Sequence, residues 1–183
     1  MYKKYFNILL IILIFSSQAN SSENVIKNLK EGGKIIFIRH ALAPGGGDPD
    51  NFNLNDCMTQ RNLSKEGINQ SKRIGFFFRK NKIPIDQVLS SEWCRCKDTA
   101  KYAFKEYKTF DALNSFFSEK FQKNKEKQIK DLLNFIKKWD GKGNLILVTH
   151  YVVILETLNL PVSSGDLVIT NKNLNLLGIV DNY

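Results

Sequence analysis

The stretch Lys34-Ile35-Ile36-Phe37-Ile38-Arg39-His40 is a short apolar run that ends in an arginine and a histidine. A run of this length predicts a buried β-strand. A second such run, Asn144-Leu145-Ile146-Leu147-Val148-Thr149-His150, ends in the other of the two histidines in the chain. In open α/β sheets, groups at the carboxyl ends of strands face the crevice that binds ligands. We therefore expect His40 and His150 to lie together at one sheet edge; the alternative is two unrelated structural histidines.

Helical and extended patterns alternate along the rest of the chain. The sequence predicts helices over 64–80, 93–107 and 152–158 and around 129–136, and strands over 88–91, 109–110, 166–170 and 174–180, the last two as a closing hairpin. Strands that alternate with helices predict an α/β fold, here a three-layer α/β/α sandwich around a mostly parallel sheet. In the first of these helices, Gly67, Ser71 and Gly75 fall four residues apart, which predicts a face that lies close to the sheet.

The start of the chain has the pattern of a secretory signal peptide. A positively charged beginning is followed by the unbroken apolar stretch 8–15, and Ser17-Gln18-Ala19 resembles a cleavage site. This apolar stretch is much shorter than the roughly 20 residues that span a bilayer. We expect a signal peptide over 1–19, one domain over 20–183, and a periplasmic or secreted protein without a stable membrane span after signal removal. An uncleaved anchor is the alternative.

The chain carries a formal net charge of +9. A basic surface attracts anionic substrates, although a solvated lysine-rich surface without a function would have the same composition. The sequence lacks the interleaved aromatic and basic residues that single-strand binders use. We therefore expect no nucleic-acid partner.

Three cysteines occur in the chain, and they suit a disulfide better than a metal site. In an oxidising compartment Cys57 would pair with Cys94 or Cys96 and tie the turn-rich segment 43–61 to the next strand end. Four-ligand zinc sites are normally built from Cys or His pairs, and both histidines have another expected role. We expect no metal and no cofactor.

Two arginines accompany the histidines and indicate phosphate chemistry. Arg39 precedes His40, and Arg95 begins a predicted helix. Guanidinium groups fit phosphate oxygens, and a helix N-terminus adds favourable N–H groups. An attacking imidazole must be neutral, and nearby arginines should lower its pKa. The four side chains would therefore form a metal-free phosphoryl pocket.

Three motifs resemble, in order and spacing, those of the histidine phosphatase superfamily. They are Ile38-Arg39-His40-Ala41, then Ser90-Ser91 with Arg95 and Asp98-Thr99-Ala100, and Thr149-His150. The resemblance covers about residues 34–150 and implies a phosphoglycerate mutase-like fold. It also implies that His40 is the nucleophile, that Arg39, Arg95 and His150 bind the phosphoryl group, and that His150 takes part in catalysis.

The sequence departs from the family pattern at the expected proton donor. Many members have a glutamate in a Leu-x-Glu element, and the corresponding Leu113-Asn114-Ser115 has serine there. Glu119 and Asp111 flank this stretch. We expect Glu119 to be the catalytic acid, with Asp111 or no acid as alternatives. Ala41, where the family has glycine, is a milder departure.

The resemblance implies a metal-independent phosphomonoester hydrolase that works through a phosphohistidine intermediate. Its partner would be a small phosphorylated substrate or a phosphorylated envelope component. The alternative is a catalytically weak or inactive phosphate-binding protein on the same fold, which Ser115 favours. The segment 43–61 either faces the substrate or is a plain connection. Arg61 at its end either adds to the pocket or pairs with an acid.

Overall fold

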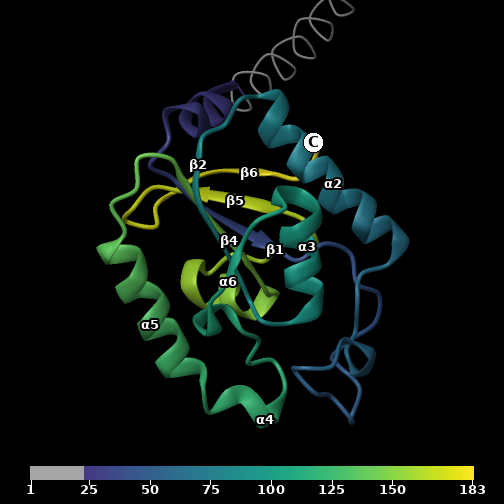
Figure 1. The fold of residues 1–183 in the computed structure, drawn as a ribbon. Coiled ribbons are helices and arrows are strands. Elements are labelled where there is room, and N and C mark those ends of the chain that lie inside the picture. The colour runs from purple at the N-terminus through teal and green to yellow at the C-terminus, as the bar shows by residue number, and fades with distance from the viewer. Residues whose placement is uncertain (1–22) are drawn as a thin grey trace, which may run out of the picture.

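The computed structural model describes residues 23–183 (Figure 1). The expected signal peptide, residues 1–19, lies outside the described residues. Within the described part of the chain, every helix is too short or too polar to cross a bilayer.

A six-stranded sheet with the order β3-β2-β4-β1-β5-β6 forms the centre of the molecule. Its strands are β1 (Ile35–Arg39), β2 (Ile85–Ser90), β3 (Lys108–Thr109), β4 (Asn144–Thr149), β5 (Leu167–Thr170) and β6 (Leu176–Val180). The first four strands run parallel, and β5 and β6 are antiparallel to their neighbours. The mostly parallel sheet and the closing hairpin are therefore confirmed.

Helices cover both faces of the sheet, which makes three layers (Figure 1). They are a helix over 23–31, α2 (Lys65–Lys80), α3 (Cys94–Phe104), α4 (Glu119–Gln122), α5 (Lys125–Lys138) and α6 (Tyr151–Leu158), with short 3₁₀ turns η1 (Cys57–Thr59) and η2 (Asp111–Leu113). Because successive strand residues point to opposite faces, Ile36 and Ile38 pack with α2 and α3. Ile35 and Phe37 pack with α5 and α6.

Helix α2 holds the segment that follows β1 in place. The Ser64 hydroxyl accepts a hydrogen bond from the Gly67 N–H at 3.1 Å and caps the helix. A Cβ added to Gly67 would overlap the carbonyl oxygen of Leu42, and one added to Gly75 would overlap that of Ala103. The nearest neighbours of these glycines are thus the chain after His40 and helix α3, whereas their spacing predicted the sheet.

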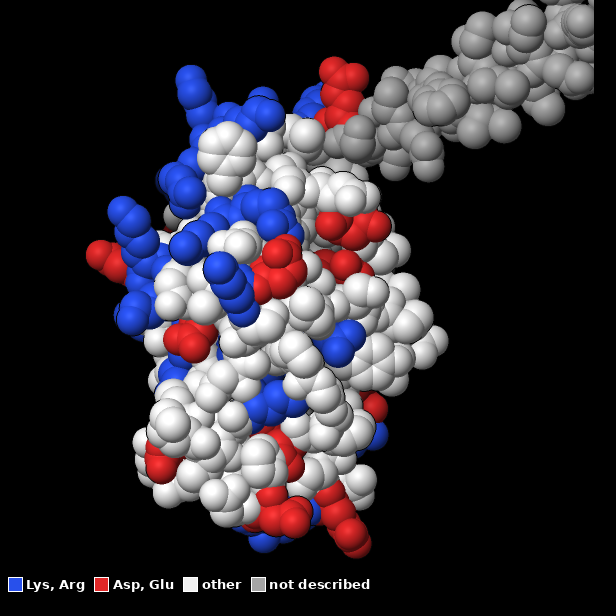
Figure 2. All heavy atoms as spheres, turned by 90° about the vertical axis from the view of Figure 1, so that its right-hand side faces the viewer, with Lys and Arg blue, Asp and Glu red and all other residues white. Residues whose placement is uncertain are grey.

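Charge is spread unevenly over the face that carries α2. Figure 2 shows Lys and Arg side chains gathered over the upper part of this face, with acidic side chains scattered over the whole of it. On this face the positive charge is therefore concentrated locally.

Candidate active site

The two histidines leave the sheet side by side because β1 and β4 are adjacent and parallel. Arg39 is in register with Thr149, and the His40 N–H donates to the Thr149 carbonyl at 2.9 Å. The ring centroids of His40 and His150 lie 5.5 Å apart. The structure thus brings together the two imidazoles at the carboxyl ends of neighbouring strands, the arrangement that the strand ends predicted.

His40 is held as a neutral imidazole with one nitrogen free. Its side chain is 2% exposed, and Nδ1 lies 2.8 Å from the Ala41 carbonyl oxygen. A carbonyl oxygen only accepts, so Nδ1 carries the proton and Nε2 keeps its lone pair. Burial, reinforced by the charge of Arg95, lowers the pKa of His40 to about 3. At neutral pH the ring is therefore uncharged and has a nucleophilic nitrogen.

Arg95 lies at the start of α3, 3% exposed, in an ion pair that the sequence did not predict. Its Nη1 lies 2.6 Å from Oδ1 of Asp48, and Nη2 lies 3.2 Å from Oδ2. Burial alone would raise the pKa of Asp48, but the hydrogen bonds and charge of Arg95 outweigh burial and keep this pKa below its usual value. Asp48 is therefore an anion that neutralises part of the positive charge of the pocket.

His150 is buried, and both of its ring nitrogens have neighbours. Nη2 of Arg95 lies 3.5 Å from Nδ1, and the Ser91 hydroxyl lies 2.9 Å from Nε2. Because arginine only donates, Nδ1 is the acceptor and Nε2 carries the proton. Ser91 in turn donates to Oδ1 of Asn114 at 3.0 Å. Burial and the charge of Arg95 lower the pKa of His150, so this ring is neutral too.

Arg39 and Arg95 each present one N–H edge that the described residues leave unpartnered. Arg39 donates from Nη1 to the Val162 carbonyl at 2.7 Å. The Nε atoms of both arginines are buried and have no hydrogen-bond partner among the described residues. Buried donors of this kind are normally satisfied, so both guanidinium groups, which line the cavity, have hydrogen-bonding capacity that the described residues leave unused.

The segment 43–61 forms one side of the site and is fixed to α3. A disulfide joins Cys57 to Cys94, which settles the pairing that the sequence left open, and Cys96 is buried and free. Arg61 donates to the carbonyls of Gly47 and Ala43 and lines the same cavity as the histidines. This segment therefore faces the pocket.

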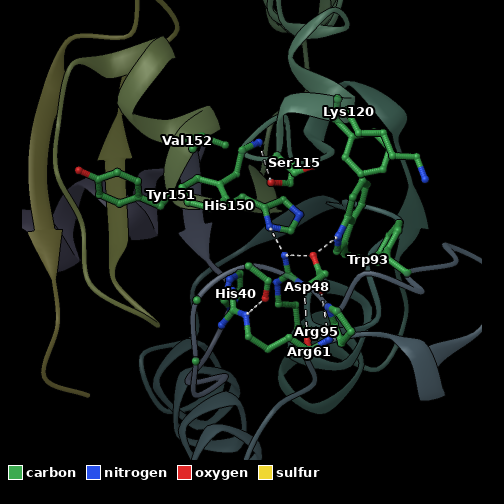
Figure 3. Close-up of a pocket in the computed structure, with 18 of the residues that line it drawn as sticks. His40, Asp48, Arg61, Trp93, Arg95, Ser115, Lys120, His150, Tyr151 and Val152 are labelled. Carbon is green, nitrogen blue, oxygen red and sulfur yellow. Dashed lines mark hydrogen bonds and ion pairs between the residues drawn. The ribbon is translucent and has the colours of Figure 1, made fainter.

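The cavity at this edge has a volume of about 620 Å³ (Figure 3). Its lining includes Arg39, His40, Arg95 and His150. Ser115 is buried and also lines it, and its hydroxyl accepts from the Phe117 N–H at 3.3 Å. The structure therefore gathers the expected phosphate-binding residues around one space.

The structure does not bring Glu119 to this cavity. Glu119 is exposed at the start of α4, where the chain instead directs Lys120 and Phe121 into the lining. Asp111 is exposed in η2 and is also absent from the lining among the described residues. The carboxylates that do line the cavity are Asp48 and Asp50.

Sequence reasoning missed Asp48, the role of Ser91 and the aromatic lining of the cavity. Asp48 lies in a glycine- and proline-rich turn segment without periodicity, so its contact with Arg95, 47 residues later, has no local signal. Ser91 stood in a recognised motif, but its bond to His150 depends on how β2 and β4 pair. The one sequence signal for these features was that segment 43–61, which contains Asp48 and Phe52, follows shortly after His40.

No protein-family model matches the sequence, and no curated protein matches it. Solved structures do match. The protein histidine phosphatase SixA in complex with tungstate is 12% identical with a TM-score of 0.55, over 78% of this chain and 92% of that one. A candidate phosphohistidine phosphatase SixA from Agrobacterium tumefaciens is 16% identical with a TM-score of 0.60, over 82% and 99%. A candidate α-ribazole-5′-P phosphatase from Escherichia coli is 15% identical with a TM-score of 0.55, over 75% and 89%.

These similarities cover most of each chain, at identities that speak for the fold alone. The TM-scores of 0.55 to 0.60 show that the path of the chain is shared with these structures. The chain therefore has the fold of the histidine phosphatase superfamily.

Proposed function

We propose that the protein is a phosphomonoester hydrolase that works through a phosphohistidine on His40, without a metal ion. The observation that carries this proposal is the state of His40: it is buried and neutral, its Nδ1 proton is held by the Ala41 carbonyl, and its Nε2 is free. Three of the solved structures with this fold are described as phosphatases, which supports the same reaction class.

The reaction has two displacements at phosphorus. In the first, Nε2 of His40 forms a bond to phosphorus, and the bond from phosphorus to the ester oxygen breaks. The leaving alkoxide takes up a proton. In the second, a water oxygen attacks phosphorus and the N–P bond breaks, which releases inorganic phosphate and returns His40 to its neutral form. The water gives up one proton to solvent, which balances the proton that the alkoxide took from solvent in the first step. Phosphoryl transfer depends mainly on alignment and on positive charge around the equatorial oxygens.

Arg39 and Arg95, which both line the cavity, would supply that positive charge. His150 would donate a hydrogen bond to a phosphoryl oxygen once its contact with Arg95 rearranges. Guanidinium groups remain charged at all working pH values. These cationic side chains support a reaction that proceeds without a metal ion.

Neither of the carboxylates considered as proton donor to the leaving oxygen is placed to act as one. Glu119 lies outside the cavity lining, and Asp48 is engaged by Arg95. A missing general acid costs about 10²–10⁴ in rate, and least for esters whose leaving group is already a weak base. We therefore propose that turnover is much faster with aryl than with alkyl phosphates.

A phosphate-binding protein without turnover is the second candidate. Ser115 at the place of the expected acid favours it. Against it stands the free nucleophilic nitrogen of His40, which binding alone does not require. Trapping of ³²P on the protein separates the two, because phosphohistidine is lost in acid and survives in alkali.

An extracytoplasmic location is part of the proposal. The Cys57–Cys94 disulfide supports it, since such bonds persist in oxidising compartments, and so does the signal-like start of the sequence. The substrate would then be a small phosphorylated molecule or a phosphorylated component of the cell envelope.

Hydrolysis of p-nitrophenyl phosphate in the presence of EDTA tests the proposal. We expect activity that resists EDTA in the wild-type protein and that is lost in His40→Ala. Activity that survives in this variant would overturn the mechanism, and a wild-type protein that binds phosphate without hydrolysing the ester would favour the second candidate.

A further inference from the structure

The cavity is larger than a phosphoryl group requires. Its volume of about 620 Å³ is in the range of sites for whole small molecules. A phosphoryl group in contact with His40, Arg39 and Arg95 would occupy only the polar end. Most of the space must therefore be filled by the alcohol part of the substrate, and the residues around that space decide its chemistry.

Three aromatic rings form one side of this space, which we call the aromatic wall: Phe52, Trp93 and Phe121. The Phe52 and Trp93 rings are stacked with centroids 5.2 Å apart. Phe121 meets Phe52 and Trp93 edge to face at 5.7 and 5.4 Å. These are favourable aromatic geometries, so the wall is a pre-formed apolar surface.

The disulfide and the core fix the members of the wall. Phe52 belongs to the segment that the Cys57–Cys94 bond joins to α3, and Trp93 directly precedes Cys94. The indole N–H of Trp93 is used by Oδ2 of Asp48 at 3.0 Å. The polar atom of the wall is therefore already satisfied. Trp93 itself is only 2% exposed, so the carbon surface that a ligand can contact belongs mainly to Phe52 and Phe121.

Further apolar groups continue the lining at the rim and on the other side. Phe117 lines the cavity although its side chain is 63% exposed. In Figure 3, Tyr151 and Val152 lie on one side of His150, and Trp93 and Lys120 lie on the other. Exposed large apolar side chains at a concave site indicate a ligand that covers them.

We propose that the substrate is a phosphomonoester whose alcohol carries a flat apolar ring, which packs between the aromatic wall and Phe117. This proposal rests on the proposed function. The hydroxyl groups of a polyol chain could bond to polar lining residues such as Asp50, Ser118 and Lys120, but they would find no partner on the three rings and would lose water wherever they lay against the wall. A ring that is bonded to the carbon next to the ester oxygen would instead reach the wall while its phosphoryl group contacts His40.

The first experiment measures binding alone, so that it does not depend on turnover. Benzylphosphonate and methylphosphonate carry the same charged group and differ only in the ring. By calorimetry we expect benzylphosphonate to bind at least about tenfold more tightly, because the ring removes apolar surface from water. Equal affinities would overturn the inference whether or not the protein hydrolyses esters.

The second experiment measures kcat/KM for benzyl phosphate, cyclohexylmethyl phosphate, ethyl phosphate and glycerol 3-phosphate. All four have alkyl leaving groups, which avoids the intrinsic reactivity of aryl esters. We expect benzyl first, cyclohexylmethyl second and glycerol last. A preference for glycerol 3-phosphate would overturn the inference, whereas hydrolysis of none of them and of no p-nitrophenyl phosphate would overturn the proposed function.

Substitutions then assign the preference to the wall. Phe117→Ala changes an exposed side chain and should reduce the benzyl-to-methyl affinity ratio by roughly 3- to 10-fold. Phe121→Leu tests the wall while keeping an apolar side chain of similar size, since Phe121 also packs against the core. Phe76→Ala, an exposed phenylalanine on α2 away from the lining, is the matched control and should leave the ratio unchanged. An affinity ratio that neither Phe117→Ala nor Phe121→Leu alters would contradict the assignment.

Discussion

The carboxylate of Asp48 forms a bidentate ion pair with the guanidinium of Arg95, with Oδ1 at 2.6 Å from Nη1 and Oδ2 at 3.2 Å from Nη2. The same carboxylate accepts from the Trp93 indole at 3.0 Å and from the Arg61 backbone N–H at 3.1 Å. The Nε edge of Arg95 is left over. The ion pair thus fixes the position of the Arg95 guanidinium beside the cavity.

Asp48→Asn removes the charge of this pair and keeps its shape. Breaking a buried ion pair by removing one partner leaves an uncompensated charge, so we expect unfolding free energy to fall by about 3 kcal/mol. We also expect kcat/KM for p-nitrophenyl phosphate to fall about tenfold, because Arg95 would no longer be held in one position. Urea unfolding and steady-state kinetics measure the two effects.

Asp50→Asn is the control for stability, because Asp50 is exposed in the same segment and has no ion pair among the described residues. If Asp48→Asn bound phosphate more tightly and lost no activity, Asp48 would compete with the substrate rather than position Arg95.

Ser91→Ala removes the hydroxyl oxygen that accepts a hydrogen bond from the Nε2–H of His150. The ring would lose the contact that fixes its tautomer, so we expect kcat to fall about tenfold with a smaller change in KM. Ser90→Ala is the matched control: Ser90 is equally buried, but its hydroxyl donates to the Ser91 carbonyl and does not touch the ring. Equal kinetic losses in both variants would reduce Ser91 to a structural role.

Glu119→Gln tests whether a carboxylate outside the cavity lining serves as the acid. Because Glu119 is exposed on α4, we expect the variant to keep wild-type kcat/KM with ethyl phosphate, a substrate that needs protonation of its leaving group. A loss of 100-fold or so confined to alkyl esters would instead restore Glu119 as the donor, through movement of α4 on binding.

Stability should depend on pH through the two buried histidines. The pKa of His40 is lowered to about 3 and that of His150 is also lowered, whereas an unfolded histidine titrates near 6.5. Below about pH 6.5 the unfolded chain binds protons that the folded chain does not, so stability falls as pH falls. Each ring should contribute about 1.4 kcal/mol per pH unit.

Urea unfolding at pH 7, 6 and 5 measures this slope, and His40→Asn should remove about half of it. Asp48 also has a lowered pKa, so its contribution is lost only when pH falls below the usual carboxylate range. It therefore leaves this window unaffected. A slope that is the same in the variant would mean that His40 is protonated in the folded protein.

The parts of the site that lie directly after strands could be predicted from the sequence. The runs ending at His40 and His150 are continuous and apolar because helices cover both faces of the sheet, and their parallel pairing sets the two rings beside each other. Arg39 follows from the same run, and Arg95 from its place at a helix start. Local patterns were sufficient to place these residues because the end of a strand fixes where the next side chain lies relative to the sheet.

The rest depends on contacts between segments far apart in the chain. Asp48 reaches Arg95 only because segment 43–61 folds back over α3, which no periodic pattern encodes. Glu119 was predicted as the acid from its nearness to Ser115 in sequence. The chain turns between the two, so that Ser115 is buried at the cavity and Glu119 is exposed.

The Cys57–Cys94 bond has a practical consequence for how the protein is prepared. Burial raises the pKa of the Cys96 thiol to about 12, so this thiol is a poor nucleophile for disulfide exchange. Cys57 and Cys94 are therefore expected to pair with each other and not with Cys96. In material produced in a reducing host this bond would be open. Such material would lack the tether between the segment that carries Phe52 and the residue that follows Trp93, so ligand preferences measured on it would describe a protein with a loosened aromatic wall.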